Sequence, residues 1–199
     1  MSRIAVLASG EGTNLQALLD SAEVGPRVVL VVSDRERAVA LDRARAAGVE
    51  AVFCDPSPYP DRDAYGTALL RALEGIDVVA LAGFMRILSP VVVHAFEDRI
   101  VNVHPSLLPA FPGAHAVRDA LEWGAKVTGV TVHLVDEEVD HGPVVLQEAV
   151  PVEPEDDEAT LHARIKRVEH RLFPVGVGLV ADGRVKVEGR RAHVIGEVG

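Results

Sequence analysis

The 199-residue sequence contains one cysteine, Cys54, and aromatic side chains make up only 4% of it. A single cysteine can form neither an internal disulfide nor a thiolate metal cage. The eight histidines show no HExxH or similar ligand spacing, so the sequence predicts no catalytic metal. No run approaches the ~18 uninterrupted apolar residues of a membrane span, and Met1 leads into a strand-like segment without a basic leader. We therefore expect a cytoplasmic protein that does not enter a membrane.

Basic residues are also scarce, because 20 Lys and Arg stand against 30 Asp and Glu, a formal net charge of -10. This balance disfavours extended contact with nucleic acid or with an anionic membrane surface. We expect small molecules as binding partners, with any phosphate held locally by a few groups. The chain length and the 48% share of hydrophobic residues fit one compact domain whose core needs no disulfide.

Short apolar runs alternate with helix-like segments through the first hundred residues. Runs that are apolar throughout are typical of parallel strands buried on both faces. The predicted strands span residues 4–8, 28–32, 51–54 and 78–82. The predicted helices span about residues 15–19, 38–47 and 61–73. This alternation predicts an α/β fold with a Rossmann-like, doubly wound, mostly parallel sheet.

The pattern changes after residue 104, where three prolines and Gly113 predict an irregular loop of about ten residues. Such a loop inside a compact domain is more often functional than idle. Segments 127–134 and 143–150 predict mixed or antiparallel strands. A helix over about 157–178 and a hairpin over 184–194 follow. We expect a single domain over residues 1–199, with a phosphate-binding half (1–100) and a catalytic half (101–199).

Residues 9–14, Ser-Gly-Glu-Gly-Thr-Asn, join the first predicted strand to the first predicted helix. Free backbone N–H groups and the helix dipole make such a junction an anion site. A dinucleotide site would need a third glycine that is absent, although Asp34 lies where a ribose-binding acid is expected. A phosphate monoester held by Gly12, Thr13 and Asn14 fits better, so we expect no NAD. An ordinary tight turn is the alternative.

Asn102 and His104 alternate along a predicted strand and so face the same way, at the end where α/β sheets bind ligands. Asparagine can donate a hydrogen bond there, and histidine can transfer a proton near neutral pH. Asp140 lies in a predicted turn, where aspartate is common without any catalytic role. No Ser or Cys occupies a recognisable nucleophile elbow. This favours direct transfer to an external acceptor without a covalent enzyme intermediate.

Four blocks occur in order along the chain: 8–16 (ASGEGTNLQ), 81–90 (LAGFMRILSP), 102–109 (NVHPSLLP) and 140–144 (DHGPV). In this order and spacing the sequence resembles the glycinamide ribonucleotide formyltransferases, the folate-dependent formyltransferase family of purine synthesis. The resemblance covers most of the chain. It implies transfer of the formyl group of a co-substrate, 10-formyltetrahydrofolate, to the amine of glycinamide ribonucleotide.

The resemblance also implies roles for individual residues. Those implied for catalysis are Asn102, His104 and Asp140. Those implied for the acceptor are Gly12, Thr13 and Asn14 at its phosphate and Glu169 at its glycinamide end. Those implied for folate are Arg62, Met85, Arg86, Ile87, Leu88 and Val139. We also expect residues 101–199 to form the folate and catalytic half of the chain.

Formyl transfer to an amine produces an oxyanion and needs a proton to reach a poor leaving group. We expect Asn102 and a protonated His104 to stabilise the oxyanion, with Asp140 keeping the imidazole charged and oriented. Two positions depart from the family pattern: His141 stands where relatives often have glycine, and Val117 where they often have histidine.

Related activities remain as alternatives. Methionyl-tRNA formyltransferase carries an additional C-terminal domain and formyltetrahydrofolate hydrolase an additional N-terminal one, and from the length of this chain we expect neither. The hydrolase is the nearer rival, because similar residues can direct the formyl group to water. A non-catalytic nucleotide-binding module or an NAD-dependent dehydrogenase would explain only the first hundred residues.

Overall fold

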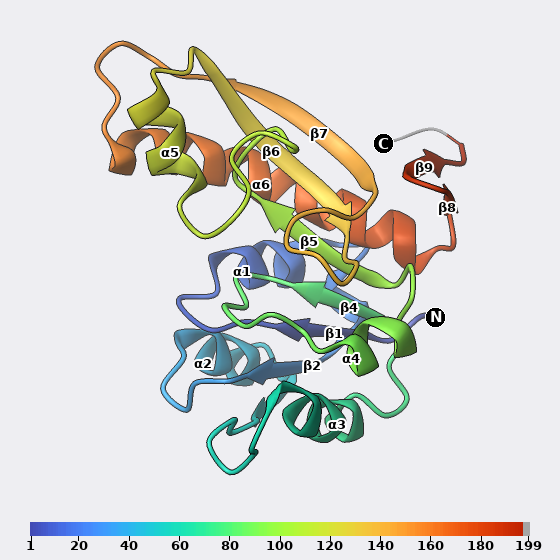
Figure 1. The fold of residues 1–199 in the computed structure, drawn as a ribbon. Helices are drawn as coiled ribbons and strands as arrows, with labels where there is room; N and C mark the ends of the chain where they lie inside the picture. The colour runs from blue at the N-terminus through green and yellow to red at the C-terminus, as the bar shows by residue number, and fades with distance from the viewer. Residues whose placement is uncertain (197–199) are drawn as a thin grey trace.

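The computed structural model describes residues 1–196 and shows, over that range, a nine-stranded sheet flanked by helices (Figure 1). The strand order is β3-β2-β1-β4-β5-β6-β7-β9-β8. The strands are β1 (Ile4–Leu7), β2 (Val28–Ser33), β3 (Glu50–Phe53), β4 (Val78–Leu81), β5 (Ile100–His104), β6 (Val127–Leu134), β7 (Val144–Pro151), β8 (Val185–Glu188) and β9 (Arg191–Val194). The helices are α1 (Thr13–Asp20), α2 (Val39–Ala46), α3 (Arg62–Ala72), α4 (Pro90–Ala95), α5 (Ala116–Trp123) and α6 (Glu158–Ala181), with a short 3-10 turn, η1 (Gly25–Arg27).

The first five strands form the predicted doubly wound parallel sheet. Successive side chains of β1 enter two different cores: Ile4 and Val6 pack with α1, α2 and α6, whereas Ala5 and Leu7 pack with α3 and α4. This alternation is the two-residue period of a strand, and helices on both faces explain why the run is apolar throughout. The predicted α/β class is confirmed.

The second part of the sheet is mixed, as predicted. β6 runs antiparallel to both β5 and β7, and β8 and β9 form the predicted antiparallel hairpin. β9 joins β7 in parallel at a single register pair, Val144 with Arg191. No helix within residues 1–196 is long and apolar enough to cross a membrane.

Two helices, α4 and α5, were not predicted, and α6 continues to Ala181 instead of ending near residue 178. α4 is short and contains three consecutive valines. Because β-branched residues have a lowered helix propensity, the sequence does not indicate a helix there. α6 contains Pro174 and two glycines, yet it packs tightly on the sheet: a Cβ at Gly176 would lie 2.5 Å from Val132 Cγ1. Tertiary packing here outweighs local helix propensity.

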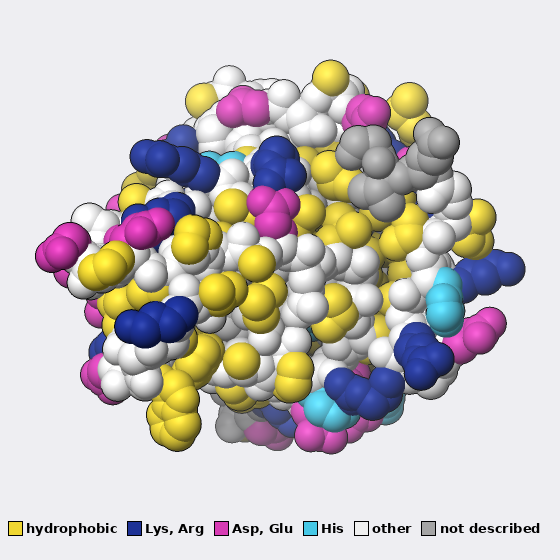
Figure 2. Space-filling model, turned by 90° about the horizontal axis from the view of Figure 1, so that it is seen from above, with side chains coloured by type: hydrophobic (Ala, Val, Ile, Leu, Met, Phe, Trp, Pro, Cys, Tyr) yellow, Lys and Arg dark blue, Asp and Glu magenta, His cyan; other side chains and the backbone are white. Residues whose placement is uncertain are grey.

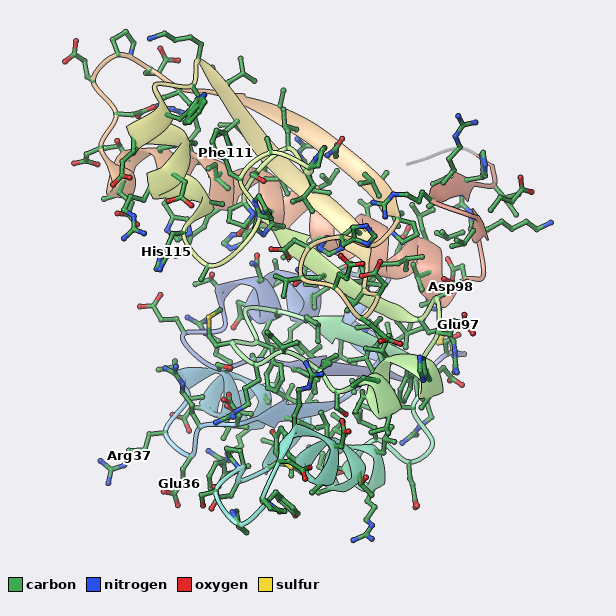
Figure 3. The ribbon with its side chains drawn as sticks, in the orientation of Figure 1. Glu36, Arg37, Glu97, Asp98, Phe111 and His115 are labelled. Atoms are coloured by element: carbon green, nitrogen blue, oxygen red, sulfur yellow. The ribbon has the colours of Figure 1, made fainter. Side chains whose placement is uncertain are left out.

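The carboxyl ends of β1, β2, β4 and β5 face one edge of the molecule (Figure 1). Figure 3 labels Glu36 and Arg37 on the loop after β2 and His115 on the loop after β5, all on the left at this edge. Glu97 and Asp98, which precede β5, lie at the opposite edge (Figure 3). Loops at the carboxyl ends of the strands are where such sheets bind ligands.

Candidate functional site

A cavity of about 780 Å³ opens among the loops at this edge. Twelve of the thirteen site residues predicted from the sequence line it: Gly12, Thr13, Asn14, Met85, Arg86, Ile87, Leu88, Asn102, His104, Val139, Asp140 and Glu169. Arg62, the first residue of α3, is exposed and is not among the lining residues. The fold therefore gathers segments from both halves of the chain around one cavity, and a folate contact by Arg62 stays a prediction.

The loop before α1 presents unbonded amides to this cavity. The first hydrogen bond of the helix runs from the Gln16 N–H to the Gly12 carbonyl (2.9 Å), so the N–H groups of Thr13, Asn14 and Leu15 have no partner within the helix. Gly12 has a φ of 69°. A Cβ there would also lie 2.9 Å from Cα and Cβ of Ala40. Glycine is thus required by the turn and by contact with α2.

Glu169 is buried in the middle of α6, with 4% of its surface exposed. It accepts a hydrogen bond from Asn14 Nδ2 (3.1 Å). Burial raises the pKa of Glu169, whereas this hydrogen bond and the charge of Lys166 act against the rise. Asn14 Oδ1 is buried and has no hydrogen-bond partner within residues 1–196. The pair therefore leaves one buried acceptor available for a donor from outside the protein.

His104 is 4% exposed, and both of its ring nitrogens face acceptors. Nε2 lies 2.8 Å from the Phe111 carbonyl, and Nδ1 lies 3.3 Å from Asp140 Oδ2. A carbonyl can only accept, so Nε2 carries a proton. Burial lowers the pKa of His104 and outweighs the opposite effects of Phe111 and Asp140. This direction of the pKa shift favours a neutral imidazole near pH 7, whereas the sequence analysis expected a charged one.

Asp140 adopts a left-handed backbone conformation with a φ of 52°. Its Oδ2 accepts a hydrogen bond from the Gly113 N–H (2.7 Å). Burial alone would raise the pKa of Asp140, but His133, Gly113 and His104 together lower it below its usual value. Asp140 is therefore ionised at neutral pH, beside an imidazole that can receive a proton.

Asn102 is held by His133, a residue that the sequence analysis missed. His133 Nδ1 donates to the Leu134 carbonyl (2.8 Å), which leaves Nε2 as an acceptor for Asn102 Nδ2 (3.1 Å). The other contact of the Asn102 amide, to Asp140 Oδ1, is 3.5 Å long and therefore weak. That N–H group can be redirected to a ligand at small cost.

The segment after β4 exposes apolar side chains to the cavity. Met85 and Ile87 are 62% and 55% exposed. The segment is tied to β1 and β2 through Asp34, which accepts hydrogen bonds from Ser9 Oγ (2.6 Å) and Arg86 Nε (2.9 Å). Both carboxylate oxygens of Asp34 are thus engaged within the protein, which leaves it a structural role rather than that of a ribose-binding acid.

Several further lining residues were missed by sequence reasoning: His115, His133, Glu158, His162 and Lys166. Glu158, His162 and Lys166 recur at intervals of four along α6, a helical spacing that was available as a signal. His133 lies opposite Asn102 in the β5–β6 register, and this pairing cannot be read from local patterns. Within residues 1–196 no group of three or more His, Cys, Asp or Glu could hold a metal ion.

Comparison with known proteins gives consistent matches over most of the chain. The family model described as formyl transferase matches residues 2–177. A phosphoribosylglycinamide formyltransferase from Mycobacterium tuberculosis is 48% identical over 195 residues, covering 96% of this chain and 90% of that protein. The crystal structure of glycinamide ribonucleotide transformylase 1 from Symbiobacterium toebii has a TM-score of 0.95 and 51% identity, covering 98% of this chain and 95% of that one.

Other matches differ in length or in activity. The human trifunctional purine biosynthetic protein adenosine-3 is 45% identical over 191 residues. The alignment covers 94% of this chain but 19% of that protein, so the chain spans about a fifth of its length. A formyltetrahydrofolate deformylase from Pseudomonas syringae has a TM-score of 0.89 at 27% identity, covering 98% of this chain and 66% of that one.

Proposed function

The chain belongs to the formyl transferase family, and on that premise we propose that it transfers the formyl group of 10-formyltetrahydrofolate to the amine of glycinamide ribonucleotide. One observation carries the proposal. The loop before α1, with its free N–H groups, lines the same cavity as Asn102 and His104 of β5 and the apolar segment after β4. A phosphorylated acceptor and a flat folate ring can therefore meet at Asn102 and His104. Each half of the chain contributes to both substrate sites, within a single domain.

The acceptor phosphate binds the free N–H groups at the start of α1, where the helix dipole also favours an anion. Lys166 lines the same cavity and supplies a positive charge. Asn14 Oδ1, the buried acceptor without a partner, receives a hydroxyl or amine donor of the ribonucleotide. Glu169, with its raised pKa, takes the proton that an ammonium group must lose before it can attack.

The folate ring lies against Met85 to Leu88 and Val139. The exposed apolar side chains of Met85, Ile87 and Val139 exclude water from it. The site needs no metal and no nicotinamide cofactor for this reaction. We infer that the protein works on small molecules and in the cytoplasm.

The reaction is direct attack of the acceptor nitrogen on the formyl carbon. The new C–N bond forms as the formyl oxygen becomes an oxyanion, which the Asn102 amide stabilises by giving up its 3.5 Å contact with Asp140. The attacking nitrogen then loses a proton, and the folate N10 gains one as its bond to the formyl carbon breaks. Formylated ribonucleotide and tetrahydrofolate leave the site.

Neutral His104 carries this proton. Nδ1 accepts it from the attacking nitrogen, and Asp140 Oδ2, 3.3 Å away, stabilises the imidazolium that results. The Phe111 carbonyl fixes the other nitrogen at 2.8 Å and so keeps the ring in one orientation. The same imidazolium then protonates the leaving nitrogen.

The proposal is tested by supplying 10-formyltetrahydrofolate with and without glycinamide ribonucleotide and following the release of tetrahydrofolate. Release that requires the ribonucleotide, with formylated ribonucleotide formed in equal amount, is the expected result. Release in water alone would identify a hydrolase instead. Tight binding of NADH, measured by calorimetry, would return the dehydrogenase to consideration.

A further inference from the structure

The turn that carries Asp140 is held from outside the cavity by the C-terminal hairpin, and we propose that Arg190 is a positioning residue for this turn. Arg190 lies between β8 and β9, and its Nη2 donates to the His141 carbonyl (2.6 Å). Its Nη1 lies 3.1 Å from Nδ1 and 2.6 Å from Nε2 of the His141 ring. The guanidinium therefore contacts both the backbone and the side chain of the residue next to Asp140.

His141 carries the contact to the other end of the loop. Its Nδ1 donates to Asp136 Oδ2 (2.7 Å), so Asp136 and His141 close the loop that leads from β6 to the turn. The Asp136 carboxylate and the Arg190 guanidinium therefore both contact the imidazole ring of His141. We name Asp136, His141 and Arg190 the outer clamp. Asp136 lines the cavity on one side, whereas His141 and Arg190 do not line it.

The turn needs such support because its conformation is unusual. Asp140 has a φ of 52°, a region that residues other than glycine adopt rarely and keep only when their surroundings enforce it. On one side, the Leu134 N–H bonds to the Pro143 carbonyl (2.9 Å), and a Cβ at Gly142 would lie 2.0 Å from the Leu134 oxygen. The outer clamp fixes the backbone at His141, directly beside the carboxylate that faces His104.

The position of the hairpin supports the same inference. β9 joins the rest of the sheet at one register pair, Val144 with Arg191, so backbone pairing alone fixes the hairpin weakly. Arg190 precedes that pair and adds side-chain contacts to the turn. A glycine at 141 would keep the carbonyl but would lose the ring that contacts Arg190 and Asp136.

The inference rests on the proposed function, because it assigns Arg190 an effect on formyl transfer through Asp140. Arg190→Met removes the guanidinium and keeps the length of the side chain. We expect kcat to fall about tenfold, since small misplacement of a catalytic group is costly, while the KM for the ribonucleotide stays within about twofold. Arg190→Lys keeps the charge but has a single nitrogen in place of the two that contact His141, and it should recover part of the loss.

Arg191→Met is the matched control. It removes the same charge at the next residue, whose side chain forms no hydrogen bond or ion pair within residues 1–196, and it should leave kcat unchanged. An equal loss in both variants would show a general effect of hairpin charge and overturn the proposal. Melting temperatures are measured in parallel, so that a loss of folded protein is recognised.

The decisive comparison uses Asp140→Asn. If Arg190 acts by positioning the Asp140 charge, Arg190→Met should cost little further activity in that background, because the positioned charge is already absent. A full tenfold loss there, or wild-type kcat in Arg190→Met alone, would overturn the proposal. If wild-type protein shows no ribonucleotide-dependent transfer at all, the proposed function fails and not the clamp; Asp140 placement is then compared between wild type and Arg190→Met by crystallography.

Discussion

At the scale of single residues, His104 and Asp140 form a pair whose members should act as one unit. Asp140→Asn keeps the shape of the side chain but removes the charge that stabilises the imidazolium 3.3 Å away. We expect kcat to fall by roughly 10²–10⁴-fold, as for other positioned acid–base groups. His104→Ala should cost a similar factor, and the double variant should be little worse than either single one. Losses that multiply in steady-state kinetics would return Asp140 to the role of an ordinary turn residue.

The pH dependence of the same pair follows from the direction of its pKa shifts. Burial lowers the pKa of His104, and Asp140 opposes that effect. Because the neutral imidazole is the active form, kcat should fall as the pH drops through this lowered pKa. Asp140→Asn removes an influence that raises the pKa, so the acid limb of its profile should lie at lower pH than in wild type. A shift to higher pH would contradict this assignment.

Gly12 shows how the structure adds to a sequence prediction. The sequence suggests Gly12 as one of the residues that hold a phosphate. The structure adds that a Cβ at this position would meet Ala40 at 2.9 Å. A bulky substitution at Gly12 therefore disturbs the packing of α2 as well as the site. Lys166 is the cleaner probe of phosphate binding.

At the scale of elements, α6 places Lys166 in the lining of the cavity. Lys166 takes no part in the proposed proton transfer. Lys166→Met should raise the KM for glycinamide ribonucleotide about tenfold, because it removes a charge-assisted contact to the phosphate, and leave kcat nearly unchanged. A dephosphorylated acceptor should bind wild type and variant alike. Lys126→Met, at an exposed position, is the control. Equal effects on both acceptors would show that Lys166 does not contact the phosphate.

Two glycines of the same helix predict opposite effects on stability. Gly176→Ala places a Cβ 2.5 Å from Val132 Cγ1, and such overpacking should lower the free energy of unfolding by about 1–3 kcal/mol. Gly178→Ala meets Val24 Cγ2 at an ordinary 3.5 Å, and should raise it by up to about 1 kcal/mol because alanine favours a helix. Denaturant unfolding of both variants tests the packing of α6 on the sheet. Stabilisation by Gly176→Ala would contradict it.

At the scale of the whole molecule, the parts predicted from the sequence were those with strong local patterns. The apolar run of β1 consists of adjacent residues and alternates with helix-like segments, so the parallel sheet could be predicted. The direction of the His104 pKa shift and the partner of Asn102 depend on burial and on the β5–β6 register. Both arise only when distant segments pack together, so local sequence patterns could not predict them.

Two surface features of the molecule were not predicted from the sequence. Figure 2, which views the molecule from above, shows hydrophobic side chains across the middle of this face, with charged side chains among them and more at its margins. A second cavity, of about 610 Å³, lies between α1 and α6, and its lining includes Gln16, Arg43 and His170. Thr13 lines both cavities, so the second one is the natural competitor for the acceptor.

The most direct test is a crystal structure with glycinamide ribonucleotide and a folate analogue that cannot donate a formyl group. The account predicts the phosphate at the amides of Thr13 and Asn14, and the folate ring against Met85 to Leu88. It also predicts the acceptor nitrogen beside Asn102 and His104. A ribonucleotide bound in the cavity between α1 and α6, or a folate ring away from Asp140, would contradict it.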